Sequence, residues 1–287
     1  MRKVFVPLLA VVLTIGCQGG SPTPVVLSLR AVLVSTDLAK GADRLVFALL
    51  DSSSAPVQAS AAWVELSSRQ DGALVSRGRQ KAVFRPWPVG TRGVFTLQAD
   101  FPTPGEWVAE ISPVDGDAAG QVARLVLRVQ ERSSTPPLGS AAPRSRNRTA
   151  KEVASLEELT TDAQPDPDLY GTTIAQALDA AKPLVVTFAT PAFCQSATCG
   201  PQVDVVKALK KAYGGRANFV HVELYDNPQE MRQDLKKARL SPVVEEWGLP
   251  SDPWTFVMDA QGRVAAKFEA FTTYQELEEA LRQVLSG

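Results

Sequence analysis

The chain has 287 residues, of which 45% are hydrophobic and 21% are charged, and its formal net charge at pH 7 is −1. This composition belongs to a globular protein and excludes a chain disordered throughout, a collagen and a polytopic membrane protein. The length predicts about two folded units, because single hydrophobic cores stop growing near ~250 to 300 residues. With 30 Lys and Arg against 31 Asp and Glu there is no positive field for a phosphate backbone, and we expect no nucleic-acid partner.

The first residues have the pattern of a secretory signal. A short basic head precedes the apolar run 4–15, which is too short to cross a ~30 Å hydrocarbon core as a helix. The run ends at Cys17 in a junction that resembles a bacterial lipobox, although Thr14 replaces the aliphatic residue usual three positions before the cysteine. The resemblance implies removal of residues 1–16, lipidation of Cys17 and anchoring to the extracytoplasmic face of the cell membrane. A plain signal peptide with a stray cysteine stays open as the alternative.

Residues 25–130 alternate apolar and polar side chains with period two, which predicts half-buried strands. Seven short strands in such a stretch are typical of an antiparallel β-sandwich of immunoglobulin-like type. The region around Pro104-Gly105 also resembles the last hairpin of such domains in secreted bacterial proteins. The stretch has no cysteine, so its core must rest on packing by aromatic residues. We expect strands at 27–33, 45–50, 61–66, 80–85, 95–101, 106–112 and 123–129, with Trp63, Phe84, Phe95 and Trp107 in the core.

Residues 131–168 change in composition to Ser, Pro, Arg and small residues, which predicts a linker and wrapping segment with one short helix at 150–159. We expect the three alternate arginines in this segment to form a solvated charge run. Residues 169–287 then alternate helical and strand patterns, which predicts an α/β sheet covered by helices. The expected helices are 172–181, 203–213, 229–238 and 273–285, and the expected strands are 184–188, 218–224, 254–258 and 264–270.

Two cysteines stand between the first of these strands and the next helix. Strand 184–188 is followed by Cys194, four further residues, Cys199 and a helix start, an order that resembles the active-site region of the thioredoxin superfamily. The sequence around Asp252-Pro253 resembles the segment in which thioredoxin-like proteins carry a cis-proline facing the cysteines. The resemblance covers about residues 170–287. It implies a thioredoxin-like fold, a disulfide between Cys194 and Cys199, and a catalytic role for both cysteines and Pro253.

The chemistry expected of this arrangement is thiol–disulfide exchange with other exported proteins, without a cofactor. A cysteine at a helix N-terminus has a lowered pKa because it faces unpaired N–H groups and the positive end of the helix dipole. The dipole alone favours Cys199 as the group of lower pKa. We nevertheless expect Cys194 to attack and Cys199 to resolve, because attack also needs access. A structural disulfide in a noncatalytic thioredoxin-fold binding protein stays open as the alternative.

The sequence departs from the thioredoxin pattern in two ways. The spacing is Cys-x4-Cys where thioredoxins have Cys-x-x-Cys, so their redox potential cannot be transferred to this chain. Thioredoxins also carry a buried Asp on the strand before the motif, and the matching position is about Thr187, which cannot accept a proton at neutral pH. Glu223, on the neighbouring strand, is the substitute candidate.

Two other families share parts of the motif. Peroxiredoxins of the bacterioferritin-comigratory type have Thr-Pro near the peroxidatic cysteine, but Thr190-Pro191 lies one residue too far from Cys194. Copper-assembly proteins of the Sco type bind copper through two cysteines and a distant histidine, which would be Cys194, Cys199 and His221. We prefer a structural, hydrogen-bonded role for His221, since that is the usual role of a lone strand histidine.

Overall fold

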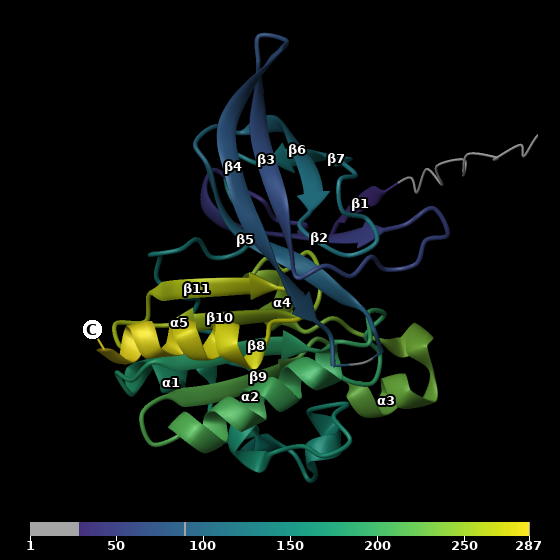
Figure 1. Ribbon diagram of the computed structural model, residues 1–287. Helices are drawn as coiled ribbons and strands as arrows, with labels where there is room; N and C mark the ends of the chain where they lie inside the picture. The colour runs from purple at the N-terminus through teal and green to yellow at the C-terminus, as the bar shows by residue number, and fades with distance from the viewer. Residues whose placement is uncertain (1–28, 89, 287) are drawn as a thin grey trace, which may run out of the picture.

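The computed structural model describes residues 29–88 and 90–286. An all-β part, residues 29–130, is stacked on an α/β part, residues 169–286 (Figure 1). We call these the β unit and the α/β unit, and residues 131–168 the connecting segment. The expected signal peptide and Cys17 lie outside the described residues. No helix in the described part is both long enough and apolar enough to cross a membrane.

The β unit has the seven expected strands, all antiparallel. They are β1 (Arg30–Leu33), β2 (Gly41–Leu50), β3 (Ala61–Gln70), β4 (Ala73–Pro86), β5 (Gly93–Phe101), β6 (Gly105–Pro113) and β7 (Ala123–Val129). Hydrogen bonds join them in one sheet of order β1-β2-β5-β4-β3-β6-β7, because the long β4 pairs with both β3 and β5. The sheet curls until β1 lies beside β7. A nearly closed single sheet thus replaces the expected pair of separate sheets, and the immunoglobulin-like assignment stays a prediction.

The core of the β unit is apolar, and one expected member is missing from it. Phe95 and Trp107 are fully buried, and the partly buried Phe84 packs against Phe95 with ring centroids 5.2 Å apart. Trp63 is 37% exposed, and the Arg79 guanidinium lies 4.8 Å from its ring centroid. The expectation for Trp63 was wrong because side chains alternate along a strand, and its two neighbours on β3 are the ones that point inward.

The connecting segment is packed against the α/β unit. Ala141 pairs with Arg263, so this part of the segment runs beside the end of β11 (Val264–Glu269). Further along, buried Ser145 and Asn147 alternate with the exposed arginines; Ser145 accepts a hydrogen bond from Trp247 Nε1 at 2.9 Å. The expected helix at 150–159 is replaced by two short 3-10 helices, Ala150–Glu152 and Leu156–Glu158. The segment therefore wraps around the α/β unit, in agreement with the predicted wrapping role.

The α/β unit has a four-stranded sheet of order β11-β10-β8-β9. Its strands are β8 (Leu184–Ala189), β9 (Asn218–Glu223), β10 (Trp254–Met258) and β11. β8 runs parallel to β9 and antiparallel to β10, and β10 and β11 form an antiparallel hairpin. Every residue of β8 is buried, as expected of a central strand covered on both faces.

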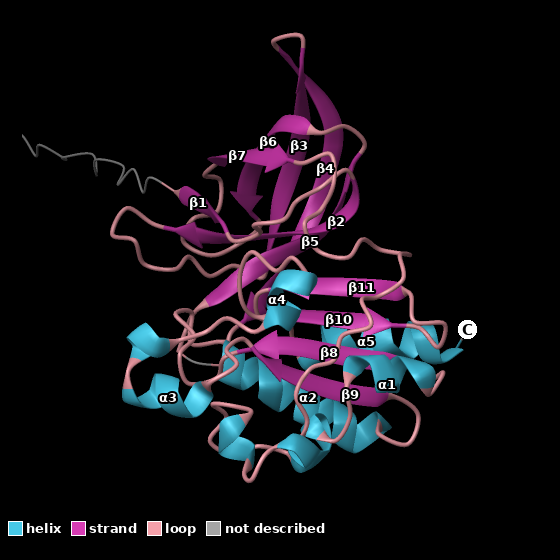
Figure 2. Cartoon of the chain, turned by 180° about the vertical axis from the view of Figure 1, so that it is seen from behind, coloured by secondary structure: helices cyan, strands magenta, loops and turns pink. Residues whose placement is uncertain are grey.

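Helices cover both faces of this sheet (Figure 2). The helices are α1 (Ile174–Asp179), α2 (Cys199–Tyr213), α3 (Pro228–Gln233), α4 (Pro242–Glu246) and α5 (Tyr274–Ser286), with 3-10 turns at Pro167–Tyr170 and Leu235–Lys237. One apolar cluster joins α1 and α4 to one face of the sheet, and a second joins α2 and α5 to the other. This sheet order, with α2 crossing over between the parallel strands β8 and β9, confirms the thioredoxin-like fold. The short helix α4 has no counterpart among the elements predicted from the sequence.

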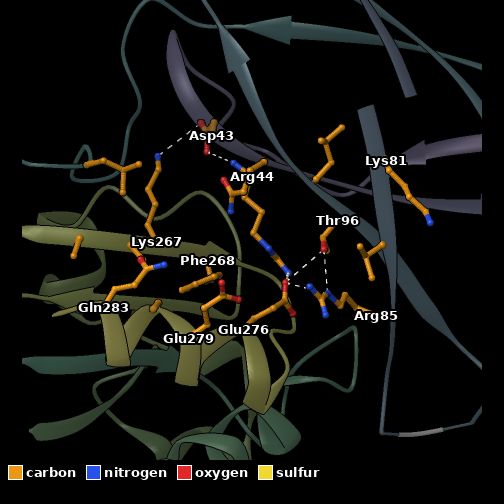
Figure 3. A pocket seen from close by; sticks show the side chains of 17 residues that line it. Asp43, Arg44, Lys81, Arg85, Thr96, Lys267, Phe268, Glu276, Glu279 and Gln283 are labelled. Atoms are coloured by element: carbon orange, nitrogen blue, oxygen red, sulfur yellow. Dashed lines mark hydrogen bonds and ion pairs between the residues drawn. The ribbon is translucent and has the colours of Figure 1, made fainter. Parts of the chain in front are cut away.

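Buried charges join the two units (Figure 3). The Arg44 guanidinium of β2 lies 3.0 Å from the Glu276 carboxylate of α5, and both side chains are more than nine-tenths buried. Arg85 also reaches Glu276, at 3.5 Å. Lys267 of β11 lies 3.6 Å from the buried Asp37 carboxylate of the β unit. A cavity of about 440 Å³ lies between the units at these groups.

Candidate redox site

The two cysteines lie where β8 leads into α2. Cys194 is in the turn after β8, and Cys199 is the first residue of α2. Their Cα atoms are 5.8 Å apart, and their sulfurs are joined in a disulfide. That separation is within the usual ~4.4 to 6.8 Å range for a bridge. Pro201 fits the first turn of α2 because an N–H at that point has no partner inside the helix.

The two sulfurs have different surroundings. Cys199 is fully buried, whereas Cys194 is partly exposed. The Ser196 hydroxyl lies 3.1 Å from the Cys194 sulfur and 2.7 Å from the Thr198 hydroxyl, so short polar side chains line the loop between the cysteines. A thiol or disulfide from solution therefore reaches Cys194 more easily than Cys199.

The segment before β10 brings a carboxylate to the buried sulfur. The Asp252–Pro253 peptide bond is cis, as the sequence predicted, and Pro253 is buried. Asp252 Oδ2 lies 3.0 Å from Cys199 Sγ. Partial burial raises the pKa of the Asp252 carboxyl above its ordinary value. Among the described residues, Asp252 has no other side-chain hydrogen bond and no ion pair, so the carboxylate faces the sulfur alone.

Sequence reasoning overlooked Asp252 as an acidic group of the site. It considered only the strand positions where thioredoxins carry an acid, whereas the acid here precedes the cis-proline. A signal was available: an Asp directly before a proline that is expected to face the cysteines must itself lie near a sulfur. At the strand position, Thr187 is buried, and its hydroxyl is 2.7 Å from that of Thr255.

Glu223, the predicted substitute acid, is hydrogen-bonded elsewhere. Its Oε2 accepts hydrogen bonds from the Thr161 N–H at 2.8 Å and from the Thr161 hydroxyl at 2.7 Å. Burial raises the pKa of Glu223 to about 7, although these hydrogen bonds oppose the shift. The Thr161 hydroxyl also accepts the Ala192 N–H at 3.1 Å. Glu223 thus supports the loop that leads to Cys194 and contacts neither sulfur.

His221 is a hydrogen-bonded residue of the core, as preferred from the sequence over its place in the alternative copper set. His221 Nε2 lies 3.1 Å from the Ala189 carbonyl oxygen, and Nδ1 lies 2.7 Å from the Tyr170 hydroxyl. Burial lowers the pKa of His221 to about 4, so the ring is neutral at pH 7 and both nitrogens are occupied. The copper set Cys194, Cys199 and His221 is therefore wrong. Within the described ranges, three potential ligand atoms gather within 4.8 Å of one another only at the two cysteines and Asp252.

Comparisons with known proteins give matches of low identity among solved structures. No protein-family model and no curated protein sequence matches the chain. Among solved structures, it is similar to a Chlorobium tepidum protein described as thiol:disulfide interchange protein DsbE, with 14% identity, 53% of this chain and 99% of that chain covered, and a TM-score of 0.38. A thioredoxin-family thiol:disulfide interchange protein from Chlorobium tepidum TLS gives 18% identity, with 44% of this chain and 99% of that chain covered, and a TM-score of 0.32. The C-terminal domain of a Bacteroides thetaiotaomicron thiol-disulfide oxidoreductase gives 16% identity, with 45% of this chain and 98% of that chain covered, and a TM-score of 0.30.

Proposed function

We propose that the protein is a thiol–disulfide oxidoreductase that uses Cys194 and Cys199. The contact between the buried Cys199 sulfur and the Asp252 carboxylate is the observation that carries the proposal. A disulfide sulfur has no proton to donate, so in the oxidised pair this partly buried carboxylate has no donor to offset its desolvation. In the reduced pair the Cys199 thiol donates to it. The surroundings therefore suit a dithiol as well as a disulfide, which a purely structural bridge does not require.

Electron transfer to a substrate follows from this geometry in two steps. The Cys194 thiolate attacks one sulfur of a substrate disulfide, whose S–S bond breaks and releases one substrate thiolate. Cys199 then gives its proton to Asp252 and attacks the Cys194 sulfur, which releases the second substrate thiolate and closes the Cys194–Cys199 bond. Two electrons pass to the substrate. The reverse sequence oxidises a substrate dithiol, and the reduction potential of the pair sets the direction.

The difference in exposure supports the assignment of Cys194 as the attacking sulfur. Cys199 is closer to the positive end of the α2 dipole, which favours its thiolate, but it is fully buried. Exchange requires a sulfur of the partner to approach in line with the bond being broken, so an accessible sulfur is needed. Cys199 therefore acts after the mixed disulfide has formed, from beneath it.

We further propose that exported proteins are the partners and that the chain is held at the extracytoplasmic face of the cell membrane through lipidated Cys17. The short apolar run ending at Cys17 supports this location. Mass spectrometry of the mature N-terminus should find a diacylated or triacylated cysteine. An N-terminus at another residue, together with recovery of the protein in the soluble fraction, would contradict the anchor and leave the redox chemistry untouched.

Two measurements test the exchange function. Equilibration with dithiothreitol redox buffers should give a potential above about −300 mV, the level below which structural disulfides lie. Reduced Cys199→Ala should form a stable mixed disulfide with insulin, used as the probe. The matched Cys194→Ala variant should not, because its remaining thiol is buried.

Other outcomes distinguish the alternatives. Trapping by Cys194→Ala alone reverses the two roles. A potential below about −300 mV, with neither folded variant trapping insulin, identifies a structural disulfide in a noncatalytic binding protein. Rapid consumption of hydrogen peroxide at Cys194, without reaction with insulin, identifies a peroxidase instead.

A further inference from the structure

The turn that carries Asp252 is held by its preceding residue. The Ser251 hydroxyl donates to Glu269 Oε1 at 2.6 Å and accepts the Trp254 indole N–H at 3.1 Å. Glu269 is the last residue of β11 and pairs with Trp254 across the sheet. Ser251 is therefore tied to two neighbouring strands, one residue away from the carboxylate that contacts Cys199.

The β unit supplies the other bonds to Glu269. Thr36, in the loop between β1 and β2, donates its N–H to Glu269 Oε2 at 2.8 Å and its hydroxyl to Oε1 at 2.5 Å. The Arg44 guanidinium donates to the Glu269 backbone carbonyl at 2.8 Å. Two of the three hydrogen bonds to this carboxylate thus come from Thr36 alone.

We propose that Thr36 is a positioning residue of the redox site, which holds Asp252 against Cys199 through Glu269 and Ser251. The inference rests on the proposed function and gives the β unit a part in it. Asp252 itself makes no other hydrogen bond within the described residues, so its two neighbours position it: Ser251 through its hydroxyl, and Pro253 through its carbonyl oxygen, which accepts the Ala270 N–H at 2.9 Å.

The physical argument concerns a buried carboxylate that needs its donors. Glu269 is 6% exposed, and burial raises the pKa of its carboxyl while the Thr36 and Ser251 hydrogen bonds oppose the shift. Without the Thr36 hydroxyl, Glu269 Oε1 keeps only the Ser251 hydroxyl as a donor, and a buried carboxylate that has lost a donor gains by moving or by admitting water. Adjacent Cα atoms are about 3.8 Å apart, so a shift of Ser251 moves Asp252 directly.

The test compares interface threonines. Thr36→Val removes the hydroxyl, and Thr36→Ser retains it. Thr96→Val is the matched control: Thr96 is also buried at the interface, but its hydroxyl lies 3.5 Å from Glu276 (Figure 3) and makes no hydrogen bond to Glu269 among the described residues. The readout is the equilibrium constant for reduction of the Cys194–Cys199 disulfide by dithiothreitol in each full-length variant.

We expect Thr36→Val to lower this constant about threefold, because a displaced Asp252 no longer accepts a hydrogen bond from the Cys199 thiol. Thr36→Ser and Thr96→Val should match the wild type, and Ser251→Ala should reproduce the Thr36→Val effect. In an Asp252→Ala background, Thr36→Val should add nothing. A wild-type constant in Thr36→Val and Ser251→Ala, or an equal effect of Thr36→Val without Asp252, would overturn the inference.

These outcomes are separate from the failure of the proposed function. A wild-type potential below about −300 mV without insulin exchange defeats the proposed function whatever the variants do. The positioning role is judged only by the difference between each variant and the wild type, and that difference is measurable for a structural disulfide as well. Should Thr36→Val fail to fold by circular dichroism, Ser251→Ala, in both backgrounds, decides the question.

Discussion

The two units bury their titratable groups in different places. Within the described part of the β unit, the buried titratable residues are Asp37, Asp43 and Arg44, and all three contact the α/β unit. The α/β unit buries Lys267 and Glu269 on its side of the same contact, but it also places His221 and Glu223 in its interior, on the strand beside the central β8. The β unit thus has an apolar interior and a charged contact surface, whereas the α/β unit has ionisable groups in its interior.

This difference indicates how each unit contributes. Buried ionisable groups require specific partners, so they fix geometry where they occur. In the α/β unit they support the loops around the cysteines, as Glu223 does through Thr161. In the β unit they fix its docking on β11 and α5. The β unit is therefore best regarded as a rigid support, and the chemistry belongs to the α/β unit.

The largest effect is expected from breaking the charged contact. Arg44→Ala leaves Glu276 buried without its nearest cation and should lower the free energy of unfolding by about 3 kcal/mol. Urea unfolding followed by circular dichroism measures this. Arg85→Ala is the control, because its side chain is 29% exposed and should contribute at most about 1 kcal/mol. Equal losses in the two variants would mean that burial of the pair is unimportant.

The next effect concerns pH and the polar interior. The pKa of Glu223 is raised to about 7 in the folded protein. Between about pH 4.5 and pH 7, Glu223 therefore keeps its proton in the folded protein and releases it in the unfolded chain. The stability that Glu223 contributes is therefore present below about pH 4.5 and is lost as pH rises to about 7. Glu223→Gln removes this dependence. Relative to the wild type, its free energy of unfolding should rise by about 3 kcal/mol between pH 4.5 and 7.5.

His221 acts in the opposite direction and provides a check. Its pKa is lowered to about 4, so its contribution is present above the unfolded value of 6.5 and is lost as pH falls to about 4. In Glu223→Gln this acid-side loss should become visible, because Glu223 no longer offsets it. A Glu223→Gln profile parallel to the wild type would show that Glu223 is ionised throughout this range.

Local patterns in the sequence were sufficient to predict most elements. Strand periodicity located all seven strands of the β unit, and the apolar run at β8 located the central strand of the α/β unit. Closure of the β unit could not be predicted, because it depends on the 14-residue β4 pairing with two strands at once. Trp63 was misplaced because its size, rather than its alternation with its neighbours, decided the assignment.

Only those parts of the candidate site that depend on local sequence could be predicted. The spacing of Cys194 and Cys199, and the candidate proline, could be identified along the chain. Asp252 and Thr36 could not be assigned roles in this way, since their contacts join segments far apart in sequence. His221 is the opposite case: it suggested a metal only as long as its partners, Tyr170 and the Ala189 carbonyl, were unknown.

A smaller effect is expected from the hydroxyl pair beneath the site. Thr187→Val leaves the Thr255 hydroxyl buried without its partner and should cost about 1 to 2 kcal/mol. The double variant Thr187→Val, Thr255→Val should recover most of that loss, because it leaves no buried hydroxyl without a partner. The site would then be apolar, like the interior of the β unit. Thermal unfolding of Thr187→Val, Thr255→Val and the double variant measures the coupling. Additive losses would show that the two hydroxyls do not interact.

The smallest expected effect concerns backbone strain, in which the two units also differ. Non-glycine residues with positive φ are Ser54 and Asp71 in the described β unit, but Ala181, Ala197 and Ala270 in the α/β unit. Alanine has no side chain that can compensate locally for the left-handed conformation. Ala197, with φ of 59°, lies between the two cysteines.

Ala197→Gly should relieve this strain and raise the free energy of unfolding by about 0.5 to 1 kcal/mol. Glycine also raises the conformational entropy of the unfolded chain, which opposes this gain in stability. In the oxidised protein the disulfide already restricts the unfolded loop, so the gain should be larger there than in the reduced protein. Ala270→Gly lies outside the disulfide loop and should give the same gain in both redox states. Unfolding in urea with and without reductant measures the four values, and a gain at Ala197 that is independent of redox state would exclude the loop argument.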